Sequence, residues 1–206
     1  GKLKIIKSRL LHITMAWFLG QYLSLLAILC LSIALSTFTS SVLSKATYLY
    51  LVLLCFVIVL KIPPTNINLL KYPAKKILSL KNILLLVCFL FSIALFTPHV
   101  AQVQNRIYTS PAFWDFNLHF PIIQNFAYGD NFPPQNESFS ALPMTYHYYF
   151  DFLLAIYTSL GLGLVNSITT ISITMFFSML VALIGICEEF FDKTGIGFTA
   201  VLLAIT

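Results

Sequence analysis

Long runs of apolar residues alternate with short polar segments along most of the chain. A transmembrane helix needs about 20 mostly apolar residues to cross a hydrocarbon core roughly 30 Å thick. Five runs approach or exceed that length and predict five complete spans: Met15–Ser36, Ala46–Ile62, Asn82–Thr97 with an inward extension from Leu78, Phe150–Val165 and Ser167–Cys187. A sixth run, Gly195–Thr206, would rise only about 18 Å. We therefore expect a truncated sixth span and interpret the chain as the N-terminal fragment of a longer protein, inactive alone.

These spans predict an all-α fold, a polytopic bundle of transmembrane helices. The pattern changes between 99 and 149, where polar residues interrupt the apolar runs. Most connections between helices are far shorter than this segment, so we expect it to have structure and a role of its own. We divide the chain into three N-terminal helices with basic segments over 1–98, a long loop over 99–149, and further helices over 150–206.

Composition restricts the class of protein. The 206 residues are 59% hydrophobic and 9% charged, whereas a soluble domain is about 25% charged. This balance excludes a soluble globular enzyme and a disordered chain. The net charge of +5 does not indicate a nucleic-acid partner, because the cations are spread between apolar runs. Each of the four cysteines lies within an apolar run, which favours reduced thiols over a disulfide framework or a zinc finger.

The cations give an orientation. Lys and Arg gather on the cytoplasmic side of membrane proteins. Nine of the twelve cations lie in two segments that alternation places on one side: Lys2, Lys4, Lys7 and Arg9, then Lys61, Lys71, Lys75, Lys76 and Lys81. We therefore expect a multi-pass protein of a cell membrane, prokaryotic in type, with a cytoplasmic N-terminus. Loop 99–149 is then extracytoplasmic, and with five spans the segment 188–193 also returns outside.

The outer loop contains a predicted helix. Ser110-Pro111 is typical of an N-cap followed by proline at the first helical position. Residues 112–128 have helical character, and Gly129 is expected to end the helix with a left-handed cap. Their apolar positions predict a short amphipathic helix on the membrane surface. Pro121 removes one backbone hydrogen bond, so we expect it to kink the helix or divide it in two.

Two acid–histidine pairs in this region are candidate chemistry. Asp115 precedes His119 by four residues, and His147 precedes Asp151 by the same interval, which places each pair on one face of a continuous helix. A carboxylate close to a bilayer is costly unless it is paired or functional. Either acid could instead be a first-turn carboxylate stabilised by a helix dipole. The aromatic residues from Tyr146 onward could be an interfacial belt.

Those four side chains also make a divalent metal possible. Two histidines and two carboxylates suit zinc or manganese. Pairs separated by four residues arise easily by chance, however, so we assign no metal site and no cofactor from the sequence.

The chain from Trp114 onward resembles the start of a GT-C superfamily membrane glycosyltransferase, close to the protein O-mannosyltransferase and lipid A aminoarabinose transferase-like groups. The resemblance lies in an ordered set of features. An acid heads a surface helix in "WDFNLHFPIIQNFAYGDNFPP". A polar-aromatic stretch enters a span in "LPMTYHYYFDFLLAIYTSLGLG". A span, a charged turn and another span follow in "VNSITTISITMFFSMLVALIGICEEFFDKTGIGFTAVLLAIT".

The resemblance implies transfer of a sugar from a polyprenyl-phosphate donor to a lipid, glycan or protein acceptor on the outer face. The matching carboxylate, Asp115, would be the general base that takes the acceptor proton. We assign His119, His147, Asp151, Arg106 and Tyr146 to substrate binding, with Arg106 as a candidate contact for the lipid phosphate. The partners are then the lipid-linked donor, the acceptor and membrane lipids.

Two other classes remain open from the residues alone. A polytopic transporter or lipid flippase is the main alternative, although transporters often carry ionisable residues within their spans and the predicted spans here hold almost none. A membrane anchor or assembly subunit without chemistry is the third, for which an ordered outer loop has no evident use.

Overall fold

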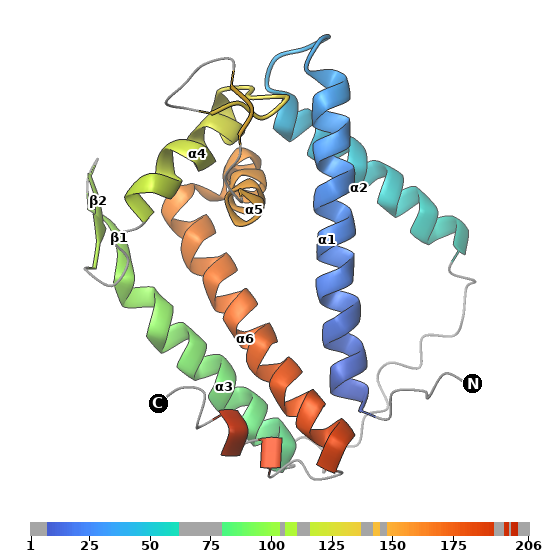
Figure 1. The fold of residues 1–206 in the computed structure, drawn as a ribbon, viewed down its shortest axis with the longest axis vertical. Helices are drawn as coiled ribbons and strands as arrows, with labels where there is room; N and C mark the ends of the chain where they lie inside the picture. Colours follow the sequence, from blue (N-terminus) through green and yellow to red (C-terminus); the bar gives the residue numbers. More distant parts are fainter. Residues whose placement is uncertain are drawn as a thin grey trace. The chain divides into compact units, whose positions relative to one another are not determined.

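The computed structural model describes the chain in segments: 8–61, 80–103, 106–110, 116–136, 142–144, 148–191, 196–197 and 199–201. Helices dominate, as predicted (Figure 1). The chain separates into two compact units. One unit comprises Gly1–Gln21, Ile67–Thr97 and Ile171–Thr206; the other comprises Tyr22–Asn66 and Pro98–Thr170.

Among the residues that the structure describes, four helices are long and apolar enough to cross a membrane. They are α1 (Arg9–Leu35), α2 (Val42–Lys61), α3 (Leu80–Phe96) and α6 (Leu164–Phe191). Residues 51–60 of α2 are all exposed although nearly all are apolar, a surface that lipid would cover and water would not. The first three predicted spans and the fifth are thus confirmed as helices, whereas the sixth lies largely outside the described residues.

The span hydroxyls show how these helices satisfy polar groups in an apolar surrounding. Without water, a hydroxyl must find a partner within the helix or on a neighbour. Among the described residues, hydroxyls that donate to the carbonyl four residues earlier, at distances of 2.8–2.9 Å, include Thr14 to Leu10, Thr47 to Leu43, Ser92 to Cys88 and Ser178 to Thr174. Ser24 of α1 and Tyr50 of α2 instead bond one another at 2.6 Å.

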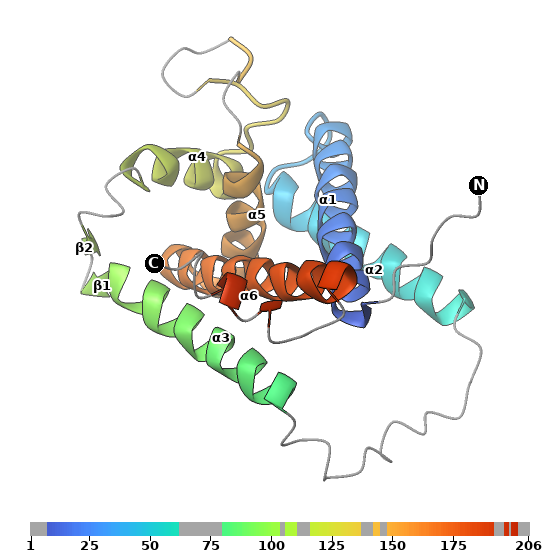
Figure 2. The ribbon, with the colours of Figure 1, turned by 60° about the horizontal axis from the view of Figure 1, so that its bottom comes forward.

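In the first unit, α3 and the C-terminal half of α6 lie side by side (Figures 1 and 2). Their core contains Cys88, Leu180, Ile184 and Val201, and Phe89 meets Phe177 edge to face, with ring centroids 5.4 Å apart. The start of α1 approaches α6 at Gly185. A Cβ at Gly185 would lie 2.5 Å from the backbone nitrogen of Leu11, so only glycine permits this approach.

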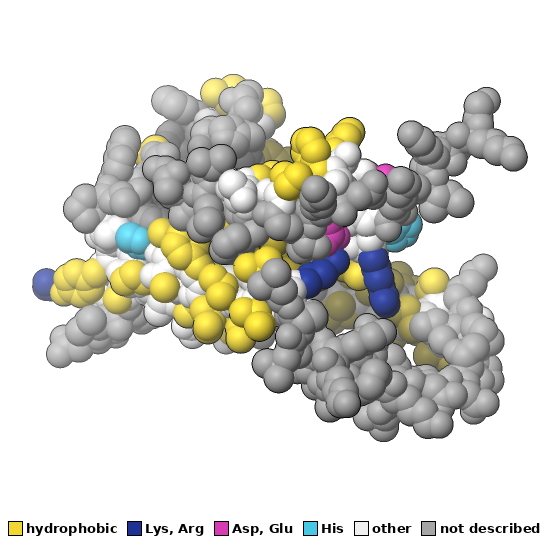
Figure 3. All heavy atoms as spheres, turned by 90° about the horizontal axis from the view of Figure 1, so that it is seen from below, with side chains coloured by type: hydrophobic (Ala, Val, Ile, Leu, Met, Phe, Trp, Pro, Cys, Tyr) yellow, Lys and Arg dark blue, Asp and Glu magenta, His cyan; other side chains and the backbone are white. Residues whose placement is uncertain are grey.

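A polar network joins three helix ends in this unit. Lys81 at the start of α3 pairs with Glu188 at 2.9 Å. The Ser8 hydroxyl donates to Glu188 at 3.0 Å, and the Ser8 backbone N–H donates to Glu189 at 2.8 Å. Ser8 also caps α1, because its Oγ accepts from the Leu11 N–H at 3.3 Å. Figure 3 shows acidic side chains directly beside basic ones, among hydrophobic side chains.

This network corrects one prediction. We expected 188–193 on the side opposite the N-terminus, but Glu188 and Glu189 lie beside Ser8 and Lys81. The cause is the predicted fourth span, Phe150–Val165. It is only nine residues of α-helix, α5 (Tyr149–Tyr157), followed by five of π-helix, Thr158–Leu162. Together they rise about 21 Å, less than the roughly 30 Å of a hydrocarbon core, and the end of α6 lies beside the start of α1.

Glycines end α5. Gly161 and Gly163 have φ of 97° and 79°, backbone conformations that side chains with a Cβ rarely adopt. Hydropathy alone could not locate this break, because Leu160, Leu162 and Leu164 continue the apolar run through it.

The second unit contains strands that we did not predict. After a short 3-10 turn (Thr97–His99), β1 (Val100–Val103) pairs antiparallel with β2 (Arg106–Thr109), Val100 facing Thr109 and Val103 facing Arg106. Ser110 closes the base of this hairpin: its N–H donates to the His99 carbonyl at 2.9 Å, and its hydroxyl bonds His99 Nδ1 at 2.7 Å. The predicted N-cap Ser110 therefore serves the hairpin, and the fold is not purely α.

The outer helix is α4 (Phe116–Tyr128). Pro121 lies inside the helix and does not divide it, although proline there removes one backbone hydrogen bond. The helix ends at Tyr128, as predicted, but the residue in the left-handed conformation is not Gly129. Gly129 N–H donates to the Asn125 carbonyl at 2.9 Å, and the left-handed residue is Asp130, with φ of 52°.

Candidate functional site

Helix α4 belongs to the segment 99–149, which we call the outer segment after its predicted side of the membrane. It packs against α5, and the two helices lie side by side in both ribbon views (Figures 1 and 2). His119 in α4 and Asp151 in α5 meet at the contact. His119 Nδ1 and Asp151 Oδ1 are 2.8 Å apart. The side chain of Asp151 is 1% exposed and that of His119 is 19% exposed.

The geometry of this pair selects a histidine tautomer. When Asp151 is ionised, its carboxylate only accepts hydrogen bonds, and Nδ1 of His119 then carries the proton that it donates to Asp151. In neutral histidine, Nε2 is then the acceptor nitrogen of the ring. A carboxylate that orients an imidazole in this way is a common element of sites that move protons.

An aromatic cluster fixes the two helices on which the pair stands. Phe126 of α4 is fully buried. Its ring lies 5.4 Å from that of Phe152, 5.3 Å from that of Tyr148 and 5.7 Å from that of Phe132. Asp151 lies in the first turn of α5, where the helix dipole favours its negative charge.

Asp130 attaches the outer segment to α2. Its carboxylate accepts from the backbone N–H groups of Ser41 at 2.8 Å and Val42 at 2.7 Å. These N–H groups lie at the start of α2, where no carbonyl of the helix can reach them. The side chain that caps α2 thus comes from a residue 88 positions away, and the left-handed backbone of Asp130 directs it there.

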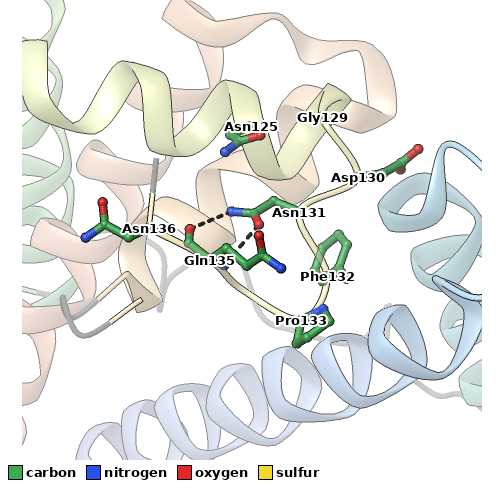
Figure 4. Close-up of a pocket in the computed structure, with 8 residues that line it drawn as sticks. All are labelled: Asn125, Gly129, Asp130, Asn131, Phe132, Pro133, Gln135 and Asn136. Atoms are coloured by element: carbon green, nitrogen blue, oxygen red, sulfur yellow. Dashed lines mark hydrogen bonds between the residues drawn. The ribbon is translucent and has the colours of Figure 1, made fainter. Parts of the chain in front are cut away.

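A polar pocket of about 340 Å³ lies between the end of α4 and the following loop (Figure 4). We call it the amide pocket, because four carboxamides line it, together with Gly129, Asp130, Phe132 and Pro133: Asn125, Asn131, Gln135 and Asn136. The Asn131 side chain closes the loop through two bonds of 3.0 Å to the backbone of Gln135. The strand-like contact between 134–136 and 142–144 supports the loop from behind.

The predicted site residues are only partly brought together. His119 and Asp151 meet across the contact between α4 and α5. Asp115, Tyr146 and His147 lie outside the described residues. Arg106 is exposed at the start of β2. In the parts of the chain that the structure describes, no group of three or more His, Cys, Asp or Glu side chains could hold a metal ion.

Sequence reasoning missed two parts of this site, the Asp130 cap and the amide pocket. The density of amides in "QNFAYGDNFPPQN" was a signal for a polar loop with side-chain hydrogen bonds. Nothing local indicated that Asp130 would reach α2.

Comparison of the chain with protein-family models, with curated proteins and with solved structures finds no match.

Proposed function

We propose that the chain is part of a membrane glycosyltransferase that moves a sugar from a polyprenyl-phosphate donor to a lipid, glycan or protein acceptor outside the cell membrane. The observation that carries the proposal is the buried His119–Asp151 pair at 2.8 Å. It stands in an ordered outer segment between apolar helices, one helical turn in sequence after Asp115. A protein that only anchors a partner has no need of an oriented imidazole there.

In this proposal Asp115 is the general base. The acceptor hydroxyl gives its proton to the Asp115 carboxylate as its oxygen bonds to the anomeric carbon. The bond from that carbon to the phosphate oxygen breaks, and polyprenyl phosphate leaves with the electron pair. Attack opposite the leaving group inverts the anomeric carbon. His119, held by Asp151, orients the base or the acceptor hydroxyl. His147, Tyr146 and Arg106 complete the substrate contacts.

The test uses the full-length protein that contains this chain, in lipid nanodiscs, with a panel of polyprenyl-phosphate sugars and a membrane lipid extract as acceptor. Release of polyprenyl phosphate reports transfer whichever sugar is moved. We expect Asp115→Asn to lower release at least about a hundredfold, since positioned bases contribute roughly 10²–10⁴ in rate. Glu137→Gln, which neutralises another acid of the same loop, is the matched control. Near-normal release by a folded Asp115→Asn variant would refute the assignment.

The second candidate is a transporter or lipid flippase, which the interrupted α5 favours. Transporters place their sites at broken helices, and α5 ends at Gly161 and Gly163 between apolar segments. A fluorescent-lipid translocation assay in proteoliposomes separates the two. Translocation without any release of polyprenyl phosphate would support transport and reject the transferase.

A further inference from the structure

The amide pocket has the chemistry of a site for a neutral, hydroxyl-rich ligand. A carboxamide offers an acceptor oxygen and two donor hydrogens without net charge. A sugar hydroxyl both donates and accepts hydrogen bonds. Two neighbouring hydroxyls of one sugar ring can therefore bond the oxygen and the nitrogen of one carboxamide. The side chains of Asn125, Gln135 and Asn136 line one pocket, whose volume of about 340 Å³ is within the range of small-molecule sites.

Charge in the lining argues against an anionic ligand. Among the residues that the structure describes, none lining the pocket is Lys, Arg or His. The single acid, Asp130, turns away from the amides toward α2 (Figure 4) and accepts two backbone N–H groups there. The lining therefore presents neither a cation for phosphate nor an available carboxylate for a cation.

The pocket is also held in shape before any ligand arrives. Asn131 ties the loop through its two bonds to Gln135. Phe132 forms part of the wall and is anchored by its packing on Phe126. Gly129 lets the Asn125 side chain lie against the backbone, since a Cβ there would be 2.3 Å from Asn125 Oδ1. A preformed site loses less conformational entropy when it binds.

We propose that the amide pocket binds a neutral glycan and is the acceptor-sugar subsite of the transferase. The acceptor part of this inference rests on the proposed function; the glycan-binding part does not. The acceptor is favoured over the donor because the donor sugar is bonded directly to a phosphate, and the described lining of the pocket holds no cation to meet one.

The test is saturation-transfer NMR on the full chain in nanodiscs. The probes are neutral tetrasaccharides of glucose, galactose and mannose, with tetragalacturonate as an anionic control. We expect saturation of at least one neutral probe and none of the anionic one. Asn125→Leu and Gln135→Met remove an amide while keeping side-chain size, and each should weaken binding roughly three- to tenfold. Asn166→Ala, an exposed amide of α6 outside the pocket, should not change it.

Absence of binding to every neutral probe, or equal affinity in wild type and both pocket variants, would overturn the inference. Gln135 is exposed, so Gln135→Met remains informative if Asn125→Leu fails to fold. Asp115→Asn separates this proposal from the proposed function. Amide-dependent binding without Asp115-dependent transfer would support the glycan site and reject the transferase. Transfer that depends on Asp115, together with glycan binding that neither amide substitution changes, would support the transferase and reject the glycan site.

Discussion

Removing the imidazole of His119 should destabilise the packing of α4 on α5. The carboxylate of Asp151 is 1% exposed and accepts from His119 at 2.8 Å. A hydrogen bond to a charged group contributes about 1.5–3 kcal/mol. Taking one partner from a buried charged pair costs about 3–5 kcal/mol. We expect His119→Ala to lower the free energy of unfolding by about 3 kcal/mol, since His119 is partly solvated and Asp151 keeps the helix dipole.

A double-mutant cycle isolates the pair from the packing around it. Asp151→Leu replaces the carboxylate with an apolar group of similar size, and His119→Ala combined with it should cost less than the sum of the single changes. We expect a coupling energy of about 2 kcal/mol. The measurement is equilibrium unfolding in mixed detergent micelles, followed by circular dichroism. A cost below about 1 kcal/mol for His119→Ala, with additive single variants, would refute the reasoning.

Three further predictions concern the scaffold. Asp130→Ala should destabilise the start of α2 by about 1–2 kcal/mol, the usual cost of a lost cap. The backbone amides there should then exchange hydrogen faster, and Asp130→Asn should recover part of the protection. Gly185→Ala should cost about 1–3 kcal/mol of unfolding free energy through overpacking; Gly20→Ala, with nothing within 4 Å, should instead stabilise by about 0.5–1 kcal/mol. Ser8→Cys and Glu189→Cys should react with an impermeant thiol reagent from the same side of sealed vesicles, and labelling from opposite sides would contradict the structure.

The spans were predictable because their signal is local and additive. Each of α1, α2, α3 and α6 is a long apolar run. Backbone N–H and C=O groups without hydrogen bonds are costly in lipid, and a helix satisfies them within the run itself. The failure at Phe150–Val165 has a physical cause. Composition indicates that the helix beginning at Tyr149 is apolar, but the backbone at Gly161 and Gly163 decides where it ends. A glycine in an apolar run is compatible with either a helix or a turn.

The candidate site was predictable only in its residue types. The sequence named His119 and Asp151 as functional candidates, but no local spacing indicated that these two side chains contact one another across 32 positions.

By itself the sequence determined a helical chain of membrane character with its scarce charge in a few segments. These properties depend on sums over neighbouring residues. Only the tertiary structure decided that His119 pairs with Asp151 across 32 positions, that Asp130 caps α2, and that Glu188 lies beside Ser8 and Lys81. Such contacts depend on which helix faces pack together and on where one chain reversal occurs. The positive-φ backbone at Gly161 and Gly163 redirects the chain into α6, and no local pattern encodes the contacts that α6 then makes.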